Sequence, residues 1–98
     1  MAASVYIVAR FRAKAGQADD LRQALSRLVA PTRRELGCYQ YDLLQSPEDP
    51  HDLCIFERWE DEASLNAHIA GETLQRTLGE ARAFMDGTPQ GGRFRLVH

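Results

Sequence analysis

The chain has 98 residues, with 12 basic and 14 acidic side chains and a formal net charge of −2. This length predicts a single domain over residues 1–98, and so short a chain often gains stability from oligomerisation. The near-neutral charge and the lack of a basic cluster argue against nucleic acid as a partner. No apolar run approaches the roughly 20 residues that span a membrane, and the start of the chain has no signal-peptide features, so we expect a cytoplasmic protein with no membrane partner.

Hydrophobic periodicity predicts four strands and three helices. Alternating apolar residues indicate strands, and apolar residues that recur every three to four positions indicate helices. In chain order, we expect a strand over residues 4–13, a helix over 17–30, strands over 38–45 and 53–60, helices over 61–70 and 72–86, and a strand over 93–98.

Glycine and proline mark the boundaries of these elements. Pro31 removes a helical hydrogen bond, so the first helix should kink or restart there, with a short helical turn over residues 31–36 that Gly37 ends. Gly71 separates the two later helices, and residues 87–92 should form a flexible loop. The loop 46–52 is too short for a crossover helix, so the two strands that flank it should be antiparallel.

The two cysteines, Cys38 and Cys54, lie in these two strands. The strand rise places their sulfur atoms about 15–20 Å apart in a hairpin. A disulfide requires Cα atoms within about 7 Å of each other. We therefore predict two free thiols, which suit a reducing compartment.

The element order predicts an α+β fold of the ferredoxin-like, split β-α-β type. It has a four-stranded antiparallel sheet with the helices on one face. The opposite face also carries apolar side chains, among them those of the first strand. A second subunit that packs sheet against sheet is the simplest cover for this face, so we expect a homodimer.

Residues 53–69 carry the main indication of chemistry. This stretch predicts a strand that runs directly into a helix with Asp61 as its N-cap. Leu65, His68 and Ile69 share the apolar face of that helix, so His68 should point inward, toward Glu57 and Trp59 on the sheet. An imidazole, a carboxylate and an indole would then meet at one apolar surface.

Two interpretations of His68 and Glu57 stay open. His68 suits a general base, because an imidazole can accept a phenolic proton near neutral pH. It also suits an inward histidine that Glu57 or a backbone carbonyl satisfies. Glu57 either orients His68 or forms a structural ion pair with Arg10, Arg33 or Arg34. Three scattered histidines do not have metal-ligand spacing, so we expect no metal site.

Four further residues are candidates for binding a substrate. Trp59 is large enough to wall a flat aromatic pocket, although a tryptophan at a strand end also suits the core. Tyr41 should lie opposite Glu57, where it would contact either a substrate oxygen or a partner subunit. Phe84 and Met85 lie near the loop 87–92 and either line the mouth of the pocket or pack in the core.

Several local segments are typical of one family. They are Lys14-Ala15-Gly16, the segment Thr32-Arg33-Arg34-Glu35-Leu36-Gly37-Cys38, Tyr41-Asp42 with Gln45-Ser46, and Phe56-Glu57-Arg58-Trp59 followed by His68. Over nearly its full length the chain resembles the antibiotic biosynthesis monooxygenase (ABM) domain family, small dimeric α+β barrels that include quinol monooxygenases. Members of this fold differ widely in chemistry, so the resemblance is poorly specific for substrate.

The resemblance implies a homodimer with one pocket per subunit, between the sheet and the helices. Oxygenase members of the family use no metal, flavin or haem. They deprotonate an electron-rich phenol or dihydroquinone, whose anion passes an electron to O₂. We therefore expect a cofactor-independent monooxygenase that acts on a quinol or polyphenolic aromatic molecule. The expected catalytic residues are His68 and Glu57, and the expected substrate-binding residues are Trp59, Tyr41, Phe84 and Met85.

Other activities of related folds are weighed against this expectation. Haem-degrading relatives have Asn, Trp and a ligand His where this chain has Ala9, His68 and Leu78, so we expect no haem. The same pocket would also suit an isomerase of a small hydroxy-carbonyl or phosphorylated metabolite, because His68 and Glu57 can move a proton between carbons. A small-molecule-binding dimer without turnover is the third possibility.

Overall fold

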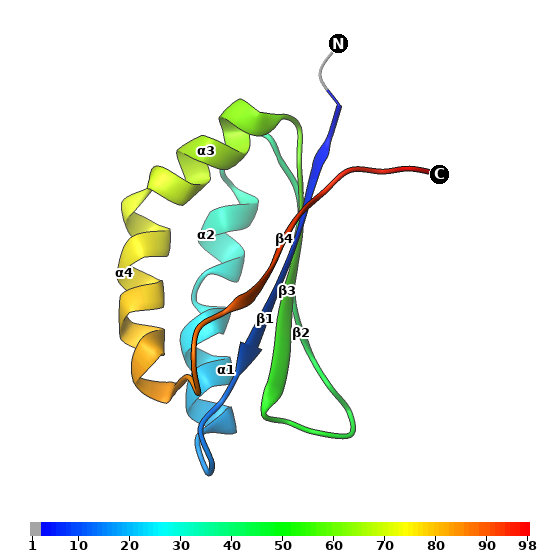
Figure 1. The fold of residues 1–98 in the computed structure, drawn as a ribbon. Helices are drawn as coiled ribbons and strands as arrows, with labels where there is room; N and C mark the ends of the chain where they lie inside the picture. The colour runs from blue at the N-terminus through cyan, green and yellow to red at the C-terminus, as the bar shows by residue number, and fades with distance from the viewer. Residues whose placement is uncertain (1–2) are drawn as a thin grey trace.

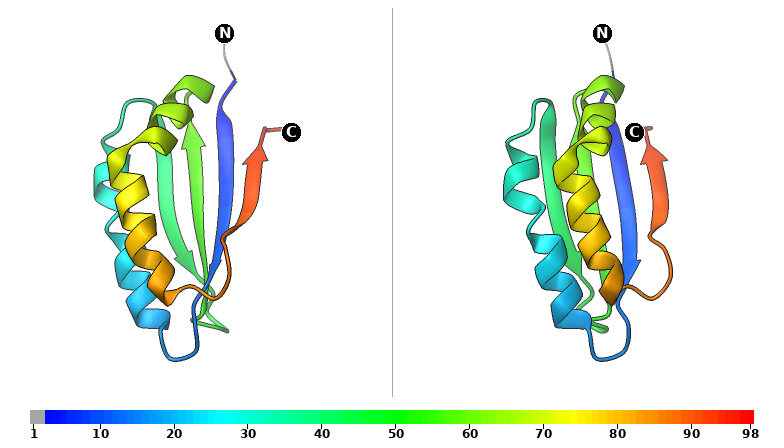
Figure 2. Two further views of the ribbon diagram at one scale, coloured as in Figure 1. Left: turned by 60° about the vertical axis from the view of Figure 1, so that its left-hand side comes forward. Right: turned by 90° about the vertical axis from the view of Figure 1, so that its left-hand side faces the viewer.

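The four strands form one antiparallel sheet in the order β2-β3-β1-β4. The computed structural model describes residues 3–98, so the first two residues of the expected domain lie outside the described part. The strands are β1 (Val5–Arg12), β2 (Cys38–Gln45), β3 (Asp52–Trp59) and β4 (Gln90–Phe94). The helices α1 (Ala18–Ser26), α2 (Val29–Arg33), α3 (Glu62–Ala70) and α4 (Glu72–Ala81), with the 3-10 turn η1 (Arg82–Phe84), all lie on one face of the sheet (Figures 1 and 2). This confirms the α+β, ferredoxin-like class. No helix among residues 3–98 combines the length and the apolar character needed to cross a membrane.

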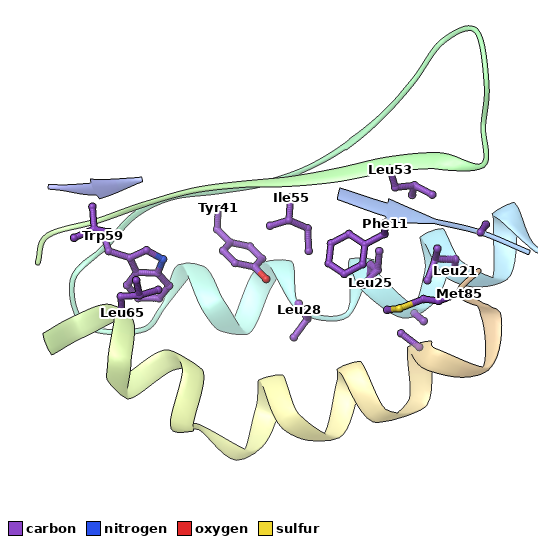
Figure 3. Close-up of a cluster of buried hydrophobic side chains, with 14 residues drawn as sticks. Phe11, Leu21, Leu25, Leu28, Tyr41, Leu53, Ile55, Trp59, Leu65 and Met85 are labelled. Carbon is purple, nitrogen blue, oxygen red and sulfur yellow. The ribbon is translucent and has the colours of Figure 1, made fainter. Parts of the chain in front are cut away.

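The core lies between the sheet and the helices (Figure 3). Buried side chains from both layers form it, with Phe11, Tyr41, Leu53, Ile55 and Trp59 from the strands and Leu21, Leu25, Leu28 and Leu65 from the helical side. Trp59 and Leu65 lie at one end of this core and Met85 at the other. Cys38 and Cys54 are free thiols, as the sequence predicts.

The opposite face of the sheet carries apolar side chains that no helix covers. We call this surface the outer face and define it by Tyr6, Val8, Leu44, Phe56 and Phe94. Leu44 is 51% and Phe94 56% exposed. The rings of Tyr6 and Phe56 lie 6.3 Å apart in the middle of this surface. The expectation of an apolar second face is therefore confirmed.

The first predicted helix is two helices. The α-helical hydrogen-bond pattern is interrupted at Arg27 and Leu28, whose backbone N–H groups bond to carbonyls three residues back. Pro31 is then the third residue of α2, where its missing N–H needs no helical acceptor. A continuous helix would place the proline ring against the carbonyl of Arg27, so the break comes before the proline and not at it.

The last strand lies earlier than residues 93–98, at Gln90–Phe94. Gly91 and Gly92 suggest a loop, but both pair with β1. Gly91 has φ +135°, and a Cβ there would lie 1.9 Å from the carbonyl oxygen of Val8. Only glycine permits this close approach, so the residue that indicates a loop in the sequence is the one that allows the strand to pair.

Two side chains, Tyr39 and Ile69, are more exposed than regular strand and helix spacing alone would make them. Tyr39 is 55% exposed because a bulge between Cys38 and Gln40 turns it away from the face that carries Tyr41. Ile69 is 40% exposed, because α3 buries only Leu65 and His68. The inward direction of His68 is confirmed.

Local contacts fix α3 against the sheet. The side chain of Asp61 accepts a hydrogen bond from the backbone N–H of Ser64 at 2.9 Å, which confirms the predicted N-cap. Gly37 has φ +82° and packs against the first turn of α3, where a Cβ would lie 2.2 Å from the Ser64 hydroxyl oxygen and 2.6 Å from its Cβ. The turn after α2 and the start of α3 therefore touch without room for a side chain.

Replacing Gly37 with alanine should destabilise the protein, because the new Cβ meets both a positive φ and Ser64. We expect Gly37→Ala to lower the free energy of unfolding by about 1–3 kcal/mol in urea denaturation. Gly79→Ala is the matched control, because Gly79 lies within α4 and a Cβ there has nothing within 4 Å. That change should raise stability by about 0.5–1 kcal/mol. A Gly37→Ala protein as stable as the wild type would contradict this account.

Candidate functional site

His68 and Trp59 form the centre of the site. The β3–α3 connection brings them together, because Trp59 ends β3 and His68 lies in the last turn of α3. Their ring centroids are 4.7 Å apart and the ring planes differ by 31°. Trp59 is 0% and His68 4% exposed. The sequence therefore predicts correctly that the indole and the imidazole meet.

The two rings contact each other directly and have no hollow between them. Carbon atoms in contact lie about 3.5–4.0 Å apart, so a flat molecule between two rings would need a separation of about 7 Å. A surface hollow of about 710 Å³ opens beside the first turn of α3, but neither Trp59 nor His68 lines it. In this conformation a substrate would have to approach His68 from another side, and not between the two rings.

Glu57 is the second member of the site. Its Oε1 accepts a hydrogen bond from the indole N–H of Trp59 at 2.8 Å and lies 3.9 Å from His68 Nε2. Burial, above all, raises the pKa of Glu57, while the Trp59 hydrogen bond and the nearby His68 oppose this effect. Of the alternatives, the structure favours the contact with His68, because this is the ion-pair contact that Glu57 makes among the described residues. Arg10 pairs with Asp52 and Arg33 with Asp42, and Arg34 makes no ion pair with Glu57 there.

Glu35 holds the other side of the imidazole, and sequence reasoning did not single it out. His68 Nδ1 lies 2.8 Å from Glu35 Oε1, within hydrogen-bond distance. The Glu35 side chain is 31% exposed, whereas that of His68 is only 2% exposed. The two residues lie 33 positions apart in a turn and a helix, so no periodic pattern links them. The only available signal was that Glu35 belongs to one of the segments on which the family resemblance rests.

Tyr41 completes the group of residues around the imidazole. It pairs with Glu57 across the β2–β3 hairpin, as predicted, and its ring meets the His68 ring edge-on at 5.7 Å. Burial, followed by the charge of Glu57, raises the pKa of the Tyr41 phenol. Tyr41 therefore stays protonated near neutral pH and suits a hydrogen-bond donor, not a base.

The structure does not bring Phe84 and Met85 to this site. Met85 forms a bridge with Ala13, beyond the far end of β1, whereas Trp59 pairs with Val5 at its start. The eight residues between these two ends of the strand span about 25 Å. A small aromatic molecule that touches His68 would not reach Met85, so we leave Phe84 and Met85 out of the proposed site.

The four residues His68, Glu57, Glu35 and Tyr41 provide groups that can move or donate a proton. They lie around one apolar wall, Trp59, and come from β2, β3, α3 and the turn after α2. Among residues 3–98, no group of three or more His, Cys, Asp or Glu side chains is placed to hold a metal ion. The arrangement suits proton transfer to or from a small molecule that stacks against, or lies beside, aromatic rings.

Comparison with known proteins identifies the family of this chain. Residues 4–79 match the family model described as antibiotic biosynthesis monooxygenase. A Mycobacterium tuberculosis protein named "Putative monooxygenase Rv0793" is 37% identical over 68 residues, which cover 69% of this chain and 66%, just under two thirds, of that protein.

Solved structures agree with this match. The crystal structure of PA3566 from Pseudomonas aeruginosa is 32% identical and has a TM-score of 0.91, with 100% of this chain and 98% of that chain covered. A variant of SnoaB, described as a cofactor-independent oxygenase from Streptomyces nogalater, has a TM-score of 0.86 over 99% of this chain and 96% of its own. Its identity is 21%, so this likeness concerns the fold alone. From the family match and the relatives together, the chain belongs to the antibiotic biosynthesis monooxygenase family.

Proposed function

We propose that this protein is a cofactor-independent monooxygenase that oxidises a quinol or polyphenolic aromatic molecule with O₂. Membership of the monooxygenase family supports the reaction class. The position of His68 carries the proposal: one ring nitrogen is bound to Glu35, and the other is directed inward toward Glu57. The fold of SnoaB, described as a cofactor-independent oxygenase, is consistent with a reaction that needs no cofactor.

In the proposed first step, the Nε2 atom of His68 accepts the proton of a substrate hydroxyl. The resulting imidazolium would lie 2.8 Å from a carboxylate oxygen of Glu35 and 3.9 Å from one of Glu57. Opposite charges at such distances favour the charged form of the base. Tyr41 would donate a hydrogen bond to a substrate oxygen, and Trp59 would support the aromatic ring of the substrate.

In the second step, the substrate anion would pass its electrons to O₂. With a dihydroquinone, one O₂ yields one hydroxyquinone and one water: one oxygen atom bonds to a ring carbon, and the other leaves as water. The substrate supplies all the electrons, so no other reductant is needed. The proton held at His68 Nε2 returns to the reduced oxygen, which restores the base.

Binding would require a movement of the helical layer. His68 is 4% and Trp59 0% exposed, so a substrate reaches Nε2 only when side chains between the sheet and the helices separate. We place the substrate beside the imidazole, on its Nε2 side, with Tyr41 as its other neighbour. Opening of this layer is then part of the binding step.

We also propose that the protein forms a homodimer through the outer face. Apolar side chains at both sheet edges, Leu44 on β2 and Phe94 on β4, are more than half exposed there. The Arg58 guanidinium lies over the rings of Tyr6 and Tyr39 at 5.7 Å and 5.2 Å, which adds aromatic surface that a partner would cover. A contiguous apolar surface of this kind is typical of an interaction site.

Oxygen uptake tests the proposed reaction. Protein treated with a chelator and freed of flavin should consume O₂ when a reduced naphthoquinone is added, in excess of autoxidation. We expect His68→Gln to lower kcat by about 100-fold, within the range found for general bases, with a smaller change in KM. His98→Gln is the matched control and should keep full activity, because His98 is exposed at the chain end.

No uptake above autoxidation across a panel of dihydroquinones would contradict the monooxygenase proposal. Conversion of a hydroxy-carbonyl compound without O₂ would point to an isomerase. A ligand that raises the melting temperature without product would indicate a binding protein.

Glu57→Gln should separate stability from activity. Burial raises the pKa of Glu57 in the folded state above its value in the unfolded state. The stability that protonated Glu57 contributes is therefore present below the unfolded-state pKa and is lost as the pH rises through the folded-state pKa. Glutamine keeps an acceptor for the Trp59 N–H and never ionises. In denaturation experiments, the variant should therefore be as stable as the wild type near pH 4 and more stable than the wild type at pH 7. Its oxygenase activity, measured by O₂ uptake, should be lower. Equal stability at pH 7 would contradict a buried charge at Glu57.

Charge on the outer face should disrupt the proposed dimer. In a two-fold dimer, Leu44→Lys with Phe94→Lys places like charges and unpaired ammonium groups in the interface. We expect the wild type to be a dimer in multi-angle light scattering and this double variant to be a monomer. Leu36→Lys with Ile69→Lys is the matched control, because both residues are exposed and neither belongs to the outer face. A wild-type monomer at micromolar concentration, or a double variant that stays dimeric, would argue against this interface.

A further inference from the structure

We propose that Glu35 is the positioning residue of this site. Its carboxylate fixes the His68 imidazole in the tautomer that leaves Nε2 free to accept the substrate proton, and it stabilises the imidazolium that forms. The chemical role rests on the proposed function, but the tautomer can be measured without any activity. The contact on which the inference depends is the 2.8 Å hydrogen bond between His68 Nδ1 and Glu35 Oε1.

The direction of this hydrogen bond decides the tautomer. An ionised carboxylate only accepts hydrogen bonds, so the hydrogen must lie on Nδ1. A neutral imidazole carries a single N–H, which leaves a lone pair on Nε2. Nε2 lies 3.9 Å from Glu57 Oε1, which is beyond hydrogen-bond distance, so Glu57 does not compete for the opposite tautomer in this structure.

The backbone holds Glu35 firmly in this position. Its N–H bonds to the carbonyl of Thr32 at 3.0 Å, and its carbonyl accepts from the N–H of Cys38 at 3.2 Å. Two residues on, Gly37 packs against Ser64, and Ser64 lies one helical turn before His68. The close contact of the turn with α3 therefore sets the distance between the carboxylate and the imidazole. This arrangement is preorganised and needs no loop movement to form.

The two carboxylates on His68 differ in their environment. The side chain of Glu57 is 9% exposed, and burial makes its negative charge costly, which raises its pKa. The side chain of Glu35 is 31% exposed, so water solvates its charge from one side. Glu35 is therefore the carboxylate that can counter a positive imidazole at a low desolvation cost. Glu35 and Glu57 therefore have different roles because their burial differs, although the two residues are of the same type.

Two titratable groups of β2 do not compete for this role. Tyr41 meets the imidazole edge-on, and Cys38 pairs with Trp59. Burial, above all, raises the pKa of both, and the charges of Glu35 and Glu57 add to the effect. Both groups therefore stay neutral near pH 7, and Glu35 and Glu57 are the acidic partners of His68 among the described residues.

The test is the nitrogen NMR spectrum of ¹⁵N-histidine-labelled protein near neutral pH. Correlations from the ring protons to both nitrogens distinguish the Nδ1–H from the Nε2–H tautomer. The chain has three histidines, so His68→Gln assigns the His68 signals by their loss. In the wild type we expect His68 as the Nδ1–H tautomer. A wild-type His68 protonated on Nε2 alone would overturn the proposal, whatever the variants do.

Variants then show whether Glu35 is the cause. Glu35→Ala should shift His68 toward the Nε2–H tautomer, and an unchanged tautomer in this folded variant would overturn the proposal. Glu60→Gln is the matched control, because Glu60 is an exposed acid that immediately follows β3. It should leave the His68 signals unchanged. Amide spectra check that each variant is folded.

Activity gives an independent readout where O₂ uptake is found. Glu35→Gln should then lower kcat by about 10- to 100-fold with little change in KM, the range found for carboxylates that orient functional histidines at metal sites. Unchanged kcat with a shifted tautomer would overturn the catalytic part of the proposal. If no dihydroquinone is oxidised, the proposed function fails, and the tautomer result still decides whether Glu35 positions the imidazole.

Discussion

The need to satisfy polar groups inside an apolar core governs this structure. An imidazole, a carboxylate and an indole N–H are enclosed between the sheet and the helices, where an unpaired polar group costs several kcal/mol. A chain of contacts reduces this cost. The Trp59 N–H bonds to Glu57, Glu57 lies beside His68, and His68 bonds to Glu35 at the edge of the solvent. The polar chain therefore runs from the core to water in three steps.

This chain of contacts also explains the architecture at its end of the sheet. The hairpin register places Tyr41 opposite Glu57, and the short β3–α3 connection turns His68 back over Trp59. Gly37 lets the turn after α2 touch α3, which brings the second carboxylate into reach. A buried carboxylate reduces stability near neutral pH, so its presence here is easier to explain by function than by folding. This trade between stability and activity is common at functional sites.

Much of this site could be predicted from sequence because its parts follow one another in the chain. The alternation of β3, the Asp61 N-cap and the helical spacing of Leu65 and His68 together indicate an inward imidazole near Glu57 and Trp59. Glu35 was not identified, because it reaches His68 across 33 residues and lies in a turn without periodicity. The direct contact of the two rings depends on how closely α3 approaches the sheet, which no local pattern encodes. The strand at Gly91 was missed for a related reason, since its glycine serves a tertiary contact.

The central claim is that a substrate hydroxyl meets His68 at Nε2 while Glu35 holds Nδ1. A crystal structure of the protein with a reduced naphthoquinone, prepared without O₂, tests this claim most directly. We predict a ligand hydroxyl within hydrogen-bond distance of His68 Nε2, with the Glu35 contact kept and Tyr41 beside the ligand. A ligand bound elsewhere, with none of its atoms within hydrogen-bond distance of His68 Nε2, would contradict it.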